Sequence, residues 1–409
     1  LEIANSSIEN ANNMTGTQNR QVAMAQENGN DTAGNGYDAS EVTLTNTTSG
    51  VINLTGDEST GIYAKRGLIF NDGQISVGKK STGIYIVEDD RSPVGAVAGA
   101  RAINTSTGVI TIGEDSTGMY YKVDPDNADG RGTNTAIGGG IVNDGKIEST
   151  ANNVIAMSFD SPYASKTMEN SATGVIDLQG QNSTGMFATG AGTYTAVNNG
   201  TIKLASSSNV NTPNIGMYTD KDTITLENNG TIEGGDKTVG IYGHNVNLGA
   251  SSLTKVGAGG TGVYSKGGNI TINGGTLSVG ENGTTGSNDA VGVYYVGQGG
   301  TITSNASDIK VGNSAYGFVV QNENGTGVTL TTNTPNVTLG EDAVYVYSNN
   351  KAGTVTNNTA LTSTGGGNYG VYSAGTVTNN ANINFGTGTG NVGVYSILGG
   401  TATNNSAIT

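Results

Sequence analysis

Apolar residues recur along this chain in a triplet made of Gly, an aliphatic residue and Tyr. Successive copies lie 22 to 37 residues apart, and several spacings fall close to the lower limit. A period of this length is typical of solenoids, in which each repeat buries its apolar side against its neighbours. The clear copies are Gly61-Ile62-Tyr63, Gly83-Ile84-Tyr85, Gly118-Met119-Tyr120, Gly185-Met186-Phe187, Gly216-Met217-Tyr218, Gly240-Ile241-Tyr242, Gly262-Val263-Tyr264, Gly292-Val293-Tyr294, Gly370-Val371-Tyr372 and Gly393-Val394-Tyr395. We assign degraded copies to Val22-Ala23-Met24, Ile155-Ala156-Met157, Gly317-Phe318-Val319 and Ala343-Val344-Tyr345.

Two further short segments complete each repeat. One ends on an Asn, as in Thr43-Leu44-Thr45-Asn46 and Ile270-Thr271-Ile272-Asn273, and the other alternates apolar with polar residues, as in Val51-Ile52-Asn53-Leu54. Alternation with period two indicates strands with one face buried, and Asn and Gly at fixed offsets suit the corners between them. No sustained helical period is present, and the hairpin signals of antiparallel sheets are missing. The sequence predicts an all-β, right-handed parallel β-helix of about 14 coils with three short strands per coil.

The recurring Asn predicts a buried ladder. Stacked coils place equivalent residues above one another, so their amides can hydrogen-bond along the axis. We therefore interpret the Asn column as structural.

We expect a single domain over residues 1–409, with loop-bearing coils over about 1–170 and more regular coils over about 171–409. Three long insertions follow Tyr85, Tyr120 and Met157, and loops on one side of a solenoid commonly bind partners. The alternative is that these loops carry no function. The candidate binding residues in and beside the insertions are Asp89, Asp90, Arg91, Arg101, Asp124, Asp126, Asp129, Arg131 and Tyr163.

The triplet tyrosines form a second candidate surface. If the aliphatic residue points inward, the neighbouring Tyr points outward, and stacking aligns the rings in a stripe suited to sugars or proteins. The alternative is that Tyr belongs to the core. The residues of this possible stripe are Tyr63, Tyr85, Tyr120, Tyr218, Tyr242, Tyr264, Tyr294, Tyr372 and Tyr395.

Composition limits the chemistry. A net charge of −15 argues against nucleic-acid binding, and the chain has no Cys and one His, His244, which we expect at a surface or corner. We expect no catalytic residues, no metal and no cofactor; a calcium ion in the acidic segment 124–130 is the alternative to a solvated turn. No apolar run is long enough for a membrane helix, and both ends fall within repeats, so we expect a monomeric fragment of a longer protein.

The repeat also resembles a known family. Ser-Thr-Gly-Ile/Met-Tyr at 59–63, 81–85 and 116–120, with Phe187 replacing Tyr, combines with Asn-x-Gly-x-Ile at 71–75. This combination is similar to the passenger repeats of large fusobacterial autotransporter adhesins, the RadD-like outer-membrane proteins. The resemblance covers about residue 40 to the end of the chain. It implies type V secretion, a passenger held on the bacterial surface by a C-terminal translocator domain, and attachment to other bacteria or to host cells.

The expected function is therefore that of a cell-surface adhesin passenger with a glycan or protein receptor. Two alternatives remain. One is a β-helix lyase or hydrolase acting on polysaccharides, which requires two suitably spaced carboxylates. The other is a passive spacer that carries a distal binding domain.

Overall fold

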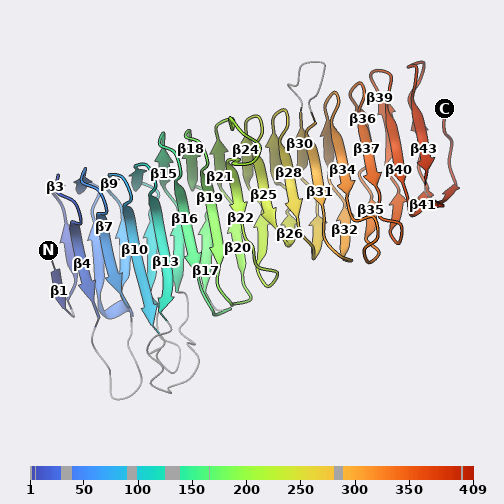
Figure 1. Ribbon diagram of the computed structural model, residues 1–409. Helices are drawn as coiled ribbons and strands as arrows, with labels where there is room; N and C mark the ends of the chain where they lie inside the picture. The colour runs from blue at the N-terminus through green and yellow to red at the C-terminus, as the bar shows by residue number, and fades with distance from the viewer. Residues whose placement is uncertain are drawn as a thin grey trace. The chain divides into compact units, whose positions relative to one another are not determined.

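The computed structural model describes residues 2–4, 6–28, 39–89, 99–124, 139–164, 166–280, 289–397 and 399–409, with the side chains of 2–4, 89 and 124 left aside. The chain separates into two compact units, Leu1–Lys203 and Leu204–Thr409. Each unit is a right-handed parallel β-helix with three strands per coil, which confirms the fold predicted from the sequence (Figure 1). We call the sheet of triplet strands sheet A, the sheet of Asn-ended strands sheet B and the third sheet C.

In the first unit, each sheet is made of every third strand in chain order. Sheet A has the order β1 (Glu2–Ala4), β4 (Val22–Glu27), β7 (Thr60–Lys65), β10 (Thr82–Asp89), β13 (Thr117–Asp124), β16 (Ile155–Asp160) and β19 (Thr184–Thr189). Sheet B has β2 (Ile8–Asn10), β5 (Thr43–Asn46), β8 (Leu68–Asn71), β11 (Arg101–Asn104), β14 (Gly140–Asn143), β17 (Thr167–Asn170) and β20 (Thr195–Asn198). Sheet C has β3 (Asn13–Gly16), β6 (Val51–Leu54), β9 (Gln74–Val77), β12 (Val109–Ile112), β15 (Lys146–Ser149), β18 (Val175–Leu178) and β21 (Thr201–Leu204).

The second unit repeats this order. Sheet A has β22 (Ile215–Tyr218), β25 (Val239–Gly243), β28 (Thr261–Ser265), β31 (Val291–Tyr295), β34 (Tyr316–Val320), β37 (Val344–Ser348), β40 (Tyr369–Ser373) and β43 (Val392–Ser396). Sheet B has β23 (Thr225–Asn228), β26 (Asn245–Leu248), β29 (Asn269–Ile272), β32 (Thr301–Ser304), β35 (Thr329–Thr332), β38 (Thr354–Asn357), β41 (Thr376–Asn379) and β44 (Thr401–Asn404). Sheet C has β24 (Thr231–Gly234), β27 (Leu253–Val256), β30 (Thr276–Val279), β33 (Asp308–Val311), β36 (Asn336–Leu339), β39 (Ala360–Ser363) and β42 (Ile383–Asn384).

The core of each unit consists of the inward positions of all three sheets. In the first unit, Ile62 pairs in register with Ile84 on sheet A, and Ile52 pairs with Ile75 on sheet C. All four side chains are buried, and burying one aliphatic side chain contributes about 1.5–3 kcal/mol. Helix is limited among the described residues to a 3₁₀ turn, η1 (Ala39–Glu41), and none of their helices could cross a bilayer.

A buried Asn ladder runs through sheet B of the first unit, as the sequence predicts. Asn71 Nδ2 donates to Asn104 Oδ1 at 2.7 Å, and Asn104 Nδ2 donates to Asn143 Oδ1 at 2.8 Å. Each of these side chains is fully buried. The amides therefore replace water as hydrogen-bonding partners inside the coil stack.

In the second unit the ladder is interrupted. The prediction that Asn273 ends a ladder strand is wrong, because Ile272 lies in register with Leu248 and Asn273 is exposed. The reason is the period of two: Ile270 and Ile272 point inward, so the next residue points outward. Amide bonding along the column resumes at Asn357, which donates to Asn379 Oδ1 at 2.8 Å.

Three degraded triplets were assigned to the wrong residues. Met24 pairs with Ile62, and Met157 pairs with Met119, so these methionines hold the aliphatic position and each assignment is one residue early. The third is two residues early, because Val346 pairs with Val371. Burial of the aliphatic side chain sets the register, and a triplet without its Gly carries too little signal to locate it.

Glycine is favoured in the triplet because backbone occupies the space of its side chain. A Cβ on Gly83 would lie 2.6 Å from the carbonyl oxygen of Gly118 in the next coil, and one on Gly61 would lie 2.5 Å from that of Gly83. A larger residue at Gly61 or Gly83 would need a local shift of the neighbouring coil; Ala156 and Tyr345 occupy the equivalent register position in other coils, so the glycine is favoured rather than required throughout.

Candidate functional site

The corner before sheet A positions the tyrosine strands. Lys80 and Asp115 adopt left-handed backbone conformations, with φ of 53° and 56°, and a buried Ser follows each. The Ser81 backbone N–H donates to Ser116 Oγ at 2.9 Å, and Ser116 Oγ donates to the Gly78 carbonyl at 2.9 Å. The Ser of the Ser-Thr-Gly motif thus links successive coils at the point where each tyrosine strand begins.

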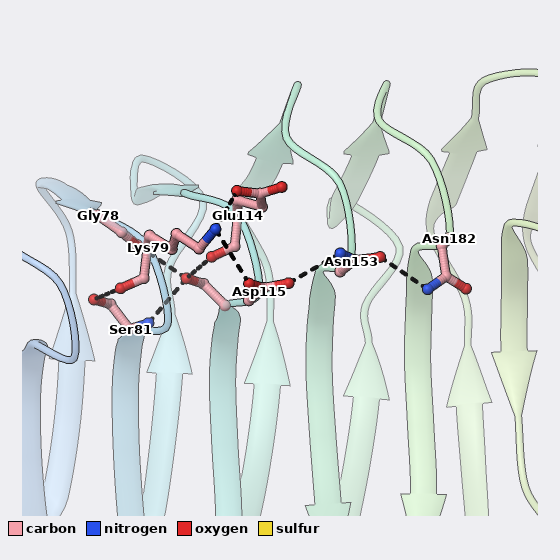
Figure 2. Close-up of polar contacts among 8 residues, drawn as sticks. Gly78, Lys79, Ser81, Glu114, Asp115, Asn153 and Asn182 are labelled. Carbon is pink, nitrogen blue, oxygen red and sulfur yellow. Dashed lines mark hydrogen bonds and ion pairs between the residues drawn. The ribbon is translucent and has the colours of Figure 1, made fainter.

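The solvent side of this corner carries a polar ladder in the first unit (Figure 2). Lys79 Nζ contacts Glu114 at 2.6 Å and Asp115 at 3.5 Å. Asn153 Nδ2 then donates to Asp115 Oδ1 at 2.9 Å, and Asn182 Nδ2 donates to Asn153 Oδ1 at 2.8 Å. These contacts link successive coils at the corner, and Lys79 offsets one of the two negative charges of Glu114 and Asp115.

The triplet tyrosines form columns on the outer face of sheet A. In the first unit Tyr85 stacks on Tyr120, with ring centroids 5.0 Å apart and planes 12° apart, and Tyr63 meets Tyr85 edge-on at 5.5 Å. The aliphatic neighbours are buried and the rings are half-exposed, so the tyrosines point outward. Burial raises the pKa of Tyr120 to about 12, and Tyr85 adds to the shift.

The second unit has a longer column. Tyr242 and Tyr264 stack with centroids 4.8 Å apart and planes 4° apart, and Tyr264 stacks on Tyr294 at 5.4 Å. Lys266 Nζ lies 5.4 Å from the Tyr242 ring centroid. Because each ring covers the face of the next, the column presents ring edges and hydroxyls to solvent, not open aromatic faces.

The second unit also has a column tyrosine that the sequence analysis missed. Tyr347 pairs with Tyr372 and stacks on it at 5.1 Å. The misplaced triplet assigned its role to Tyr345, which is fully buried, with the hydroxyl 3.2 Å from Thr359 Oγ1. Tyr218, Tyr372 and Tyr395 lie in the same register position as the other column tyrosines. Alternation alone did not identify the outward ring, because Tyr345 occupies the buried position that Gly370 holds in the next coil.

The predicted insertion residues divide into two groups. Asp90, Arg91, Asp126, Asp129 and Arg131 lie outside the described residues. Asp89 and Asp124 end β10 and β13 as paired residues in adjacent coils. Arg101 begins β11, half-buried, and half-buried Tyr163 follows β16, where its backbone N–H donates to Ser161 Oγ at 3.1 Å.

All three predicted insertions connect sheet A to sheet B. The connection from β4 to β5, residues 28–42, spans the same corner and was not recognised in the sequence. The sequence indicated this connection by the long interval between Val22-Ala23-Met24, the first degraded triplet, and Asn46. Two smaller insertions, near 205–214 and 281–290, instead connect sheet C to sheet A.

A buried charged cluster lies where these connections begin in the first unit. Lys166 Nζ contacts Glu88 Oε1 at 2.8 Å with both side chains fully buried, and the Tyr121 hydroxyl donates to Glu88 Oε2. Tyr121 stacks on Phe159 at 4.5 Å. This cluster was not predicted from the sequence; its local signal was Glu88 at an inward position after the apolar pair Ile86-Val87.

Sheet C of the first unit carries a shallow groove with two carboxylates. Glu148 and Asp177 are paired residues of adjacent coils that line a cavity of about 250 Å³. Glu148 contacts Lys146 Nζ at 2.5 Å, which raises the pKa of Lys146, and Asp177 accepts from Gln179 Nε2 at 2.5 Å. Within the described part of the chain, no three His, Asp or Glu side chains gather to hold a metal ion. His244 is half-buried at the corner between β25 and β26.

Comparison with known proteins found no matching family model, no similar curated protein and no similar solved structure.

Proposed function

We propose that this chain belongs to the passenger of a bacterial autotransporter adhesin. In this proposal it lies outside the cell, a translocator domain of the full-length protein anchors it in the outer membrane, and it attaches to bacteria or host cells. The receptor is a glycan or a protein. The repeat resemblance supports the family, and the partly exposed tyrosine columns support the binding role.

The tyrosine columns are the observation on which the binding role rests. Tyr is enriched at protein interfaces because it combines a large apolar area with a hydroxyl and loses little conformational entropy. Tyr242 and Tyr264 place two hydroxyl-bearing ring edges about one strand spacing apart, and neighbouring coils continue the row. An extended receptor segment could contact several coils at once.

Cell-attachment and glycan-array measurements with beads carrying residues 1–409 test this proposal. The variant combines Tyr242→Ser with Tyr264→Ser and should lower attachment at least tenfold. Tyr316→Ser is the matched control, because Tyr316 is half-exposed on sheet A of the same unit but pairs with Val291 and Val344, outside the tyrosine column. The double variant loses three ring pairs, Tyr218–Tyr242, Tyr242–Tyr264 and Tyr264–Tyr294, at about 0.5–1.5 kcal/mol each, so thermal unfolding must first show that both variants fold.

Attachment that is equal in all three proteins would rule out the columns as the binding surface. A second variant, with 90–98 and 125–138 replaced by short Gly-Ser links, then tests the insertions while keeping β10, β13 and Arg101 intact. If the wild-type chain attaches to no cell or glycan, the passive spacer is the better interpretation.

A polysaccharide-acting enzyme is the second candidate, and the Glu148–Asp177 pair favours it. Glu148 and Asp177 are in register on adjacent parallel strands, whose backbones lie about 4.8 Å apart, so both carboxylates line the same groove; retaining glycosidases hold two carboxylates about 5–5.5 Å apart. We rank it second because Lys146 and Gln179 already engage these carboxylates. Reducing-end release from polysaccharides that disappears in Glu148→Gln would establish this alternative.

A further inference from the structure

The outer face of sheet B in the second unit repeats one motif, Thr-x-Thr-x-Asn, in five consecutive coils. The outward residues are Thr301, Thr303 and Asn305; Thr329, Thr331 and Asn333; Thr354, Thr356 and Asn358; Thr376, Thr378 and Asn380; and Thr401, Thr403 and Asn405. The Thr positions pair in register from each coil to the next. The face is therefore a flat array of three polar columns.

These columns are exposed to solvent and aligned by their own hydrogen bonds. The outer Thr and the Asn of each coil are exposed, and the central Thr of the first four coils is half-exposed between them. Asn333 Nδ2 donates to Asn305 Oδ1 at 2.7 Å, and Asn358 Nδ2 donates to Asn333 Oδ1 at 2.8 Å. The ladder holds the amides in line, yet each retains hydrogen-bonding capacity toward solvent.

No charged residue occupies any of these fifteen positions, although the chain carries a net charge of −15. Sheet B of the first unit is different, since its outward positions include Arg101, Glu169 and the apolar pair Leu68 and Phe70. Copies of an acidic chain repel one another over most of their surface. The Thr-Asn face is a region where two copies can approach without opposing like charges.

We propose that this Thr-Asn face binds the same face of a second copy of the chain. Hydroxyls and amides both donate and accept hydrogen bonds, so a surface made of them is complementary to itself under a two-fold axis. An acidic or basic partner finds no countercharge here. The proposal differs from the monomer expected from the sequence, and the measurements below distinguish the two.

The size of the face sets the strength of the association. Five coils at about 4.8 Å and five residues at about 3.3 Å give roughly 24 by 16 Å, or about 400 Å² per copy. A stable complex typically buries about 800 Å² per partner, so a single contact is weak and reversible. On a surface that carries many copies, simultaneous contacts multiply the strength of attachment.

The association goes beyond the proposed receptor binding, because it uses a different sheet and a different partner. Its role between cells rests on the proposed surface location, whereas the association itself can be measured in solution. A failure of the adhesin proposal therefore leaves this test unchanged.

Sedimentation equilibrium over a wide concentration range tests the proposal, together with clumping of beads coated with residues 1–409. Thr331→Asp with Thr356→Asp should weaken self-association at least tenfold, because four added charges oppose one another in the dimer. The control is Thr338→Asp with Thr362→Asp, which adds the same charge in the same two coils, on the exposed outer face of sheet C. Raising the salt concentration should strengthen wild-type association by screening the net negative charge.

A complementary variant separates face-to-face contact from misfolding. Beads with Thr331→Lys and Thr356→Lys should not clump alone but should clump with the Asp variant, because opposite charges then meet across the interface. A wild-type chain that stays monomeric in solution and leaves beads dispersed would overturn the proposal. Equal loss in the sheet C control, or no clumping of the mixed beads, would overturn it as well.

Discussion

The buried Asn ladder of the first unit predicts strongly non-additive mutations. Asn104→Leu removes one member of the ladder and leaves Asn71 Nδ2 and Asn143 Oδ1 without their partners at 2.7 and 2.8 Å. An orphaned buried donor or acceptor costs about 1–3 kcal/mol, so this change should destabilise the unit by about 4 kcal/mol. Asn143→Leu likewise removes the ladder partners of Asn104 Nδ2 and Asn170 Oδ1.

The double variant should cost far less than the sum. With both residues replaced, the orphaned atoms are again two, Asn71 Nδ2 and Asn170 Oδ1, so the cost stays near 4 kcal/mol instead of about 8. Asn104 Nδ2 also lies 3.3 Å from the carbonyls of Gly108 and Lys146, which lowers the expected coupling to about 2–4 kcal/mol. The second unit already contains such a pair of apolar replacements, because Leu248 and Ile272 occupy adjacent positions of its ladder column.

Urea unfolding followed by circular dichroism measures this coupling in the four proteins of the cycle. The control is Asn380→Ala, which removes the hydrogen bonds from Asn380 Nδ2 to Asn358 Oδ1 (2.9 Å) and from Asn405 Nδ2 to Asn380 Oδ1 (2.8 Å) in an exposed ladder, where water replaces the lost partners. It should change stability by no more than about 0.5 kcal/mol. Additive effects of the two buried substitutions would refute the argument that orphaned amides set their cost.

Three further predictions follow from buried positions. Gly83→Ala should destabilise by about 1–3 kcal/mol in urea unfolding, because its Cβ would lie 2.6 Å from the Gly118 carbonyl; an unchanged midpoint would contradict this backbone packing. Burial raises the pKa of Tyr345 to about 12 from 10, so above pH 10 the unfolded state loses its proton first and stability falls by roughly 2 kcal/mol by pH 12. Tyr345→Phe should remove that part of the alkaline loss in urea unfolding at pH 8 to 12, and an identical pH dependence would disprove it. Lys166→Met should cost about 3–5 kcal/mol by stranding buried Glu88, while adding Glu88→Gln should restore part of it; a double variant no more stable than the single would argue against the ion pair.

Much of the candidate tyrosine surface could be predicted locally. Outward orientation follows from alternation, since Ile241 must be buried and Tyr242 is its neighbour. The rings' mutual stacking could not be predicted from one repeat, because it depends on the in-register rise between coils. That stacking covers the aromatic faces and leaves hydroxyls and edges available, which changes the kind of receptor contact expected.

The charged cluster shows what local sequence does not reveal. Glu88 and Lys166 are 78 residues apart, and only the stacking of coils brings their side chains to 2.8 Å. Nothing near either residue marks the other as its partner. The Thr-Asn face is the opposite case, because the Thr-x-Thr-x-Asn motif can be recognised in the sequence of each coil. An extended uncharged surface forms only when the five coils align in register.

The amino-acid sequence by itself determined the coil: the period, three strands, the inward aliphatic column and the glycine next to it. These are local properties, since alternation with period two decides which side chains face inward. The tertiary structure decided register, including the shifts at Met24, Met157 and Val346, and it decided which distant residues meet. Those outcomes depend on the free energy of the whole stack, because each coil buries its apolar side chains only against the coils on either side of it.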